Sequence, residues 1–175
     1  GRVLNVGPSL AYTTIQAAVN DAQDGDLILI APGDYNERIS IDKWVHIKGN
    51  DLVPGSVYVH YSVTVFSYDQ TYDCPFPPGF DKKILFEGVK VECFSAWDVC
   101  VYIKNNYLGE YIFNKCILTT EATAYVIGFA SPSFTAPTVK LKNCNVIRGY
   151  ASFLRFGCAW SLTACYVPNY YLYSC

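Results

Sequence analysis

The sequence predicts an all-β fold, a parallel β-helix in which short strands wind into stacked coils behind one N-terminal α-helix. Three observations support this class. One amphipathic helical pattern occurs near the N-terminus, a strand pattern of constant form recurs along the rest of the chain, and no helical pattern separates the strands. A solenoid with a capped end combines these features, whereas a doubly wound α/β sheet needs helices between its strands.

The N-terminal helix is predicted from its cap and its apolar stripe. Residues 13–16, Thr-Thr-Ile-Gln, are typical of a capping box in which a Thr oxygen caps the helix and Gln16 reaches back. The stripe at helical spacing ends near Gly25. It consists of Ile15, Ala18, Val19 and Ala22.

Three short strands are expected directly after the helix. Residues 26–31 and 38–41 are apolar or alternate, and the turn Pro32-Gly33-Asp34 separates them. Residues 44–49 form the third strand, where His46 alternates with Val45 and Ile47 and is expected to face outward.

A repeat follows, in which apolar residues alternate, a two-residue polar or small corner intervenes, and the alternation resumes. The repeats cover residues 84–91, 111–118, 139–146 and 160–167, and their starts are 27, 28 and 21 residues apart. Residues 100–104, 125–128 and 152–156 lie between them and are expected to form another face of the same coils. This spacing suits one coil of a three-sided solenoid.

Aligning the repeats places one column of cysteines on the inward side, the cysteine ladder. It consists of Cys116, Cys144 and Cys165, with Val89 in the first repeat. Neighbours in such a column are about 4.8 Å apart, whereas a disulfide prefers Cβ atoms about 3.5–4.5 Å apart. We therefore expect free buried thiols here, and Cys74 and Cys175 are better disulfide candidates. As a set, the eight cysteines fit four disulfides or buried thiols.

Composition narrows the possible partners. The 175 residues suit one domain, and a net charge of −2 with scattered basic residues argues against nucleic-acid binding. No apolar run approaches the ~20 residues of a membrane span. The cysteines have no zinc-ligand spacing, so we expect no metal and no cofactor.

The first fifty residues resemble the N-terminal cap of pectin-lyase-like right-handed parallel β-helix proteins, a cap shared by pectin methylesterases and by phage or viral spike and surface proteins. The resemblance rests on residues 12–19, 25–37, 39–41 and 47–49. It implies one domain over residues 1–175. Residues 1–25 would form a strand and the capping helix, and residues 26–175 the coils, with projecting loops near 66–82 and 128–137.

The resemblance does not extend to a complete set of catalytic motifs. Gly33–Glu37 matches the first pectin methylesterase motif, but the later Gln-Ala-Val-Ala, Gln-Asp, Asp-Phe-Ile-Phe-Gly and Leu-Gly-Arg-Pro-Trp segments are missing. The outward charged candidates are thinly spread along the chain. They are Lys90, Glu92, Lys104, Glu110, Arg148 and Arg155. We therefore expect no catalytic residues and a protein that is not an enzyme.

Aromatic residues gather in three segments that we interpret as a candidate interface: the loop 66–82, the loop 128–137 and the C-terminal stretch. The candidate residues are Tyr68, Tyr72, Phe76, Phe80, Phe129, Phe134, Tyr170, Tyr171 and Tyr173. An uncapped solenoid end exposes unpaired strand edges, so we expect it to be covered by a homo-oligomer or a larger particle.

Two functions follow from these observations. The first is a structural or attachment module of a viral or phage surface, decoration or spike protein, located on a virion or extracellular surface. The alternative is a carbohydrate-active protein, either a reduced esterase or lyase or a glycan-binding module, whose aromatic loops stack on sugar rings.

Overall fold

The computed structural model describes the chain in ten stretches. They are residues 1–61, 63–65, 83–93, 101–103, 110–120, 127–129, 138–147, 151–153, 159–163 and 170–172. Among these residues one helix, α1 (Ile15–Asp21), lies between the first and second strands, and the strands all pair in parallel. The predicted class, an all-β right-handed parallel β-helix with one capping helix, is confirmed.

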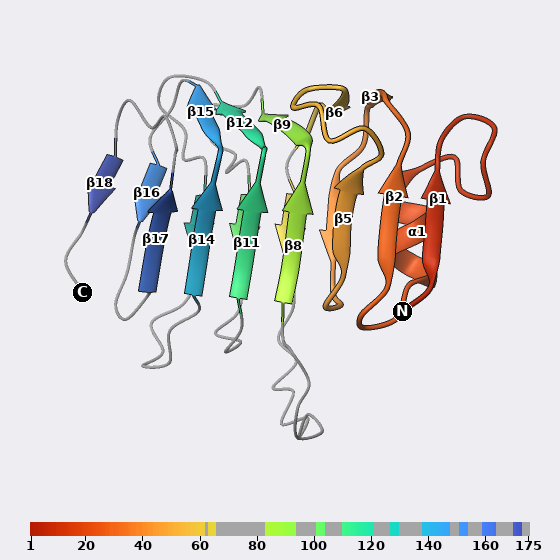
Figure 1. The fold of residues 1–175 in the computed structure, drawn as a ribbon, viewed down its shortest axis with the longest axis horizontal. Helices are drawn as coiled ribbons and strands as arrows, with labels where there is room; N and C mark the ends of the chain where they lie inside the picture. Colours follow the sequence, from red (N-terminus) through yellow and green to blue (C-terminus); the bar gives the residue numbers. More distant parts are fainter. Residues whose placement is uncertain are drawn as a thin grey trace.

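The coils that begin at β2, β5, β8 and β11 each contribute one strand to each side of the solenoid, so that strands distant in the chain become neighbours (Figure 1). The seven-stranded sheet consists of β1 (Val3–Val6), β2 (Leu27–Ile30), β5 (His46–Gly49), β8 (Lys83–Glu87), β11 (Glu110–Asn114), β14 (Thr138–Lys142) and β17 (Ala159–Thr163). The five-stranded sheet consists of β3 (Gly33–Tyr35), β6 (Val57–Val59), β9 (Val89–Cys93), β12 (Ile117–Thr120) and β15 (Asn145–Ile147). The third side holds β4 (Ile39–Ile41), β7 (Val63–Val65), β10 (Val101–Ile103) and β13 (Ile127–Phe129), and β16 (Ala151–Phe153) pairs with β18 (Tyr170–Leu172).

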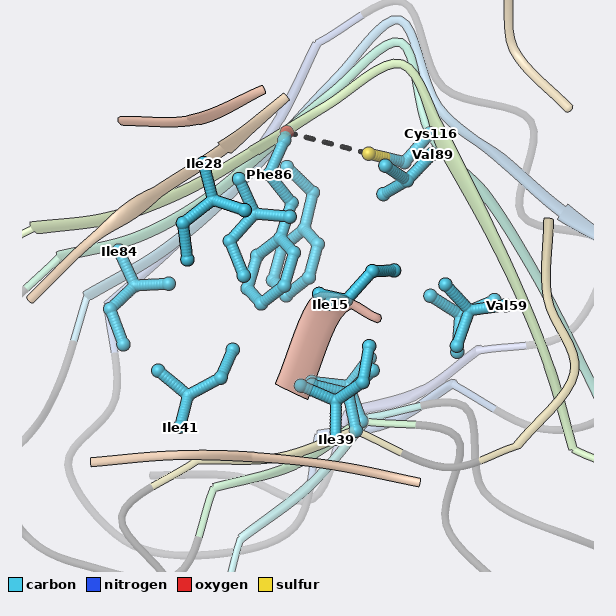
Figure 2. Packing of buried hydrophobic residues seen from close by; sticks show 14 of the residues in the cluster. Ile15, Ile28, Ile39, Ile41, Val59, Ile84, Phe86, Val89 and Cys116 are labelled. Carbon is cyan, nitrogen blue, oxygen red and sulfur yellow. Dashed lines mark hydrogen bonds between the residues drawn. The ribbon is translucent and has the colours of Figure 1, made fainter. Parts of the chain in front are cut away.

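The strand register confirms the repeat read from the sequence. Ile84, Tyr111, Val139 and Trp160 are paired across β8, β11, β14 and β17, as the alignment predicts. Two residues further, the stacked rings of Phe86 and Phe113 are parallel within 2°, with centroids 5.0 Å apart. Figure 2 shows residues from all three sides pointing into this common core.

The corner between the seven-stranded and five-stranded sheets repeats one backbone conformation. Gly88, Lys115 and Asn143 follow β8, β11 and β14, and each has a positive φ between 53° and 67°. Gly88 has a second constraint, because a Cβ atom there would lie 2.9 Å from the Cα of Leu52. In the three repeats whose corner the structure describes, one corner residue therefore has a left-handed conformation, which stacks from coil to coil.

The helix is capped differently from the prediction. Thr14 is the N-cap, and its hydroxyl oxygen accepts from the amide of Ala17 at 3.2 Å. The Gln16 side chain does not reach back: it exchanges two hydrogen bonds with the backbone of Ser40 on β4. The apolar stripe of the helix is buried as predicted. Because the helix starts one residue later than a Thr13 cap requires, Gln16 lies in the wrong position for a capping box.

Two ladder cysteines lie inside the coils. Cys116 and Cys144 are buried and not disulfide-bonded, and each thiol donates to a carbonyl oxygen of the preceding coil, Phe86 at 3.4 Å and Phe113 at 3.3 Å. Figure 2 shows the bond from Cys116 to Phe86. Burial raises the pKa of the Cys116 thiol well above its ordinary value, so this group stays protonated. Cys165 lies outside the described residues.

Three residues of the candidate interface lie in the described part of the chain. Phe129 lies in strand β13, within the segment expected to be a loop, because this strand runs one residue beyond the predicted strand 125–128. Tyr170 and Tyr171 lie in β18, in register with Ala151 and Ser152 of β16. The remaining interface candidates lie outside the described residues: Tyr68, Tyr72, Phe76, Phe80, Phe134 and Tyr173.

Candidate functional site

Strand alternation gathers polar residues on the outer face of the five-stranded sheet. Tyr35, Val57, Val59, Val89 and Val91 point inward and are buried. The residues between them must therefore point outward. Figure 1 places β3, β6 and β9 side by side along this side of the solenoid, although β3 and β9 are more than fifty residues apart.

The register then brings five of these residues together, and we name them the outer-face cluster. Asp34 on β3 pairs with Tyr58 on β6, and Tyr58 pairs with Lys90 on β9. His60 and Glu92 lie two residues further along, on the same side as Tyr58 and Lys90. The outer-face cluster is Asp34, Tyr58, His60, Lys90 and Glu92.

Glu92 is the carboxylate at one end of this cluster. Its Oε2 accepts from the Tyr58 hydroxyl and lies 3.0 Å from Lys90 Nζ. Burial raises the pKa of Glu92, but the hydrogen bonds from Tyr58 and Lys90 outweigh it and hold the pKa below its ordinary value. The pKa of Lys90 is raised in turn: its burial opposes this, but the bond to Glu92 prevails. Both groups are therefore charged at neutral pH.

His60 forms the other end of the cluster together with Asp34. His60 Nε2 lies 3.2 Å from Asp34 Oδ1, and the His60 ring stacks on Tyr58 with a centroid separation of 3.8 Å. The Lys90 ammonium lies 4.0 Å from the centroid of the same Tyr58 ring. Tyr58 therefore joins the two ends of the cluster, and its own pKa is raised by burial and by the bond to Glu92.

The arrangement supplies the groups that acid–base chemistry needs on one accessible face. An imidazole oriented by a carboxylate is a general base, and an ammonium group stabilises developing negative charge. The His60 side chain is 22% exposed and the Asp34 side chain 71% exposed, so this pair is open to solvent and to a ligand. Within the described residues, no group of three or more His, Cys, Asp or Glu side chains has the geometry to hold a metal ion.

A second row of polar residues lies on the outer face of the seven-stranded sheet. His46 faces outward as predicted, and its Nε2 lies 2.9 Å from Glu87 Oε1. Burial lowers the pKa of His46 despite Glu87, so the imidazole is neutral at pH 7. Glu110 pairs with Lys140 at 2.9 Å in the same sheet. The His46–Glu87 and Glu110–Lys140 pairs lie outside the outer-face cluster, so substitutions in them serve as controls for substitutions in the cluster.

The Gly33–Glu37 motif has a structural role here. The Tyr35 side chain is buried and its hydroxyl donates to the carbonyl oxygen of Ala31 at 2.7 Å. Glu37 caps helix α1, because its two carboxylate oxygens accept from the amides of Ile15 at 2.7 Å and Gln16 at 3.0 Å. The motif thus fixes the cap to the first complete coil.

We expect Glu37→Gln to lower the free energy of unfolding by about 1 kcal/mol, because a neutral amide oxygen replaces two charge-assisted bonds at a helix N-terminus. Urea denaturation monitored by circular dichroism measures this. Asp34→Asn, which changes an exposed carboxylate in the same turn, is the matched control and should stay within about 0.5 kcal/mol of the parent. Equal losses in both variants would contradict the capping role.

Sequence reasoning identified part of this cluster only. Lys90 and Glu92 face outward as predicted, but they are not isolated: Tyr58 and His60 join them from β6. Lys104, Arg148 and Arg155 lie outside the described residues. The signal for the missing strand was the alternation Val57-Tyr58-Val59-His60, which is too short to identify a strand with confidence on its own. Which residue of β9 faces Tyr58 depends on the register, and the sequence gives no local indication of it.

Comparison with known proteins supports the fold. No family model and no curated protein sequence matches the chain. Among solved structures, the chain is similar to the crystal structure of the pectin methylesterase from Aspergillus niger in deglycosylated form, with a TM-score of 0.63 and 16% identity over 93% of this chain. The same enzyme in penultimately deglycosylated form gives a TM-score of 0.48 and 13% identity, covering 93% of this chain and 84% of that one. The chain covers 55% of the first structure, about half of its length.

These similarities correct the expectation that the protein is not an enzyme. The first of these structures is that of an enzyme, so the missing motifs do not by themselves place this chain among inert β-helices. At 16% identity this likeness is one of fold, and it lends no support to the viral or phage structural role. In the described part of the chain, no helix is long and apolar enough to cross a membrane. Self-assembly stays a prediction.

Proposed function

We propose that this protein is a hydrolase that binds a polysaccharide on the outer face of the five-stranded sheet. The observation that carries the proposal is the outer-face cluster itself, in which three successive coils present a His–Asp pair and a Lys–Glu–Tyr group side by side. The similarity of the fold to a pectin methylesterase supports a carbohydrate as the ligand.

In this proposal His60 acts as the general base. Asp34 orients the imidazole, and the base takes a proton from a water molecule that attacks the carbonyl carbon of an ester on the bound sugar; the imidazolium then gives this proton to the departing alcohol oxygen. Lys90 keeps its contact with Glu92 and donates a remaining N–H to the carbonyl oxygen, on which negative charge develops. Tyr58 holds both ends of the site, since it contacts the His60 ring and donates to Glu92.

The flat geometry of the sheet suits an extended polymer. Successive coils are about 4.8 Å apart, so Asp34, Tyr58 and Lys90 form a row along the solenoid axis. A linear polysaccharide laid along this row meets polar side chains from several coils at once. Rigid strands hold these groups, which is how precise binding sites are usually supported.

The test is a screen of plant and microbial polysaccharides with two readouts, release of reducing ends and release of free acid or alcohol from esters. We expect one polymer to be hydrolysed, and we expect His60→Ala to lower the rate by about 10²–10⁴-fold, the usual contribution of a general base.

The matched control is His46→Ala, which removes the other described histidine–carboxylate pair, on the seven-stranded sheet. It should retain the parent rate. Folding of each variant is checked by circular dichroism. Hydrolysis that survives His60→Ala unchanged, or a parent protein that neither binds nor hydrolyses any polymer of the screen, would refute the proposal.

A further inference from the structure

The charges of the outer-face cluster are internally compensated. Lys90 is its only lysine or arginine, and its ammonium group lies 3.0 Å from Glu92. Both side chains are mostly covered, at 25% and 22% exposure. Asp34 adds a second carboxylate beside His60. The lysine that the cluster presents to a ligand is therefore already paired with a carboxylate.

This compensation has a consequence for the sugars that the site accepts. A carboxylate-bearing sugar unit would have to displace Glu92 from Lys90, or lie against two carboxylates, and both cost free energy. An uncharged unit meets no such penalty, because hydroxyl groups donate to carboxylates and accept from the ammonium group. Arg38 is a cation outside the cluster, 5.9 Å from the ring centroid of Tyr61, the residue that follows His60.

We infer that Glu92 is a specificity-determining residue that makes the outer-face cluster select uncharged sugar units over carboxylate-bearing ones. The inference rests on the proposed function and adds the charge class of the ligand. Glu92 acts by neutralising Lys90, so it is a positioning residue and takes no part in the hydrolytic step.

The experiment compares two forms of one polymer, a polyuronate and the same polymer with its carboxyl groups reduced to primary alcohols. Isothermal titration gives the affinity of the intact protein for each form, and the ratio of the two is the readout. We expect the parent to bind the reduced form about tenfold more tightly, because a carboxylate of the polyuronate would have to displace Glu92 from Lys90.

Three variants identify the cause. Glu92→Gln should move the ratio by about tenfold or more towards the polyuronate, because Lys90 loses its partner. The double variant K90Q/E92Q should return the ratio to the parent value, which separates Lys90 from Arg38 as the source of the change. Glu110→Gln frees Lys140 in an equivalent pair on the seven-stranded sheet and should leave the ratio unchanged.

The outcomes separate this inference from the proposed function. Binding that depends on His60 but has the same ratio in Glu92→Gln and in the parent overturns the role of Glu92 and leaves the proposed function standing. A shifted ratio in the double variant also overturns it, since Lys90 would then not be the cation involved. Failure of both the parent and Glu92→Gln to bind either polymer overturns the proposed function and this inference together.

Discussion

Replacing Phe113 by alanine is expected to lower the free energy of unfolding by about 3–5 kcal/mol, the usual range for a buried phenylalanine. Phe113 is 1% exposed and stacks on Phe86 of the preceding coil. Its removal leaves a cavity at the centre of a solenoid whose coils contact only their neighbours. The loss is therefore expected to reach the coils on both sides of β11.

Urea denaturation at constant temperature measures the effect, and two variants calibrate it. Phe113→Leu keeps most of the volume and should lose less than half as much. Ile112→Ala removes an adjacent side chain of the same strand that faces outward, and it should cost about 1 kcal/mol or less. If Ile112→Ala costs as much as Phe113→Ala, the inward and outward faces of β11 have been assigned wrongly.

The same alternation of inward and outward residues explains why the fold was predictable from sequence. The inward columns of β8, β11 and β14 appear in the sequence as alternating apolar residues around a two-residue corner, and a solenoid repeats that pattern in every coil. The residue pattern of one coil therefore predicts the packing of the whole solenoid. The corner conformation was not predictable at Lys115, because lysine seldom adopts a positive φ and only the stacking on Gly88 and Asn143 explains it there.

The candidate site was less predictable, because it depends on register between segments that are far apart in the chain. Tyr58 and Glu92 are 34 residues apart, and the strand that carries Tyr58 is three residues long. Glu37 illustrates the same limit. Its motif indicated similarity to an enzyme, yet its carboxylate caps a helix. A residue's neighbours in sequence do not reveal such contacts across coils.

The stability of the N-terminal cap depends on one buried carboxylate, Asp26. Its side chain is 3% exposed and accepts four hydrogen bonds, from the Gln23 amide at 2.9 Å and from the Arg2 amide, Nε and Nη2 at 2.6, 3.1 and 2.9 Å. We expect Asp26→Asn to lower the free energy of unfolding by about 2 kcal/mol, because the amide nitrogen cannot accept and leaves donors without a partner. Asp21→Asn is the matched control. Asp21 also contacts Arg2, at 3.4 Å, but its side chain is 54% exposed, so its loss should cost about 0.5 kcal/mol.

The pH dependence of this difference follows from the pKa of Asp26. Burial raises that pKa, but the hydrogen bonds from Gln23 and Arg2 outweigh burial and lower it below the ordinary value. A carboxyl group with a lowered folded-state pKa stabilises the protein fully above its unfolded-state pKa of about 4, and this stabilisation is lost as pH falls through the folded-state value. The gap in unfolding free energy between the parent and Asp26→Asn should therefore be constant from pH 7 to pH 5 and shrink below about pH 4. Chemical denaturation at a series of pH values measures the gap, and one that widens on acidification would show that the Asp26 carboxylate does not stabilise the cap.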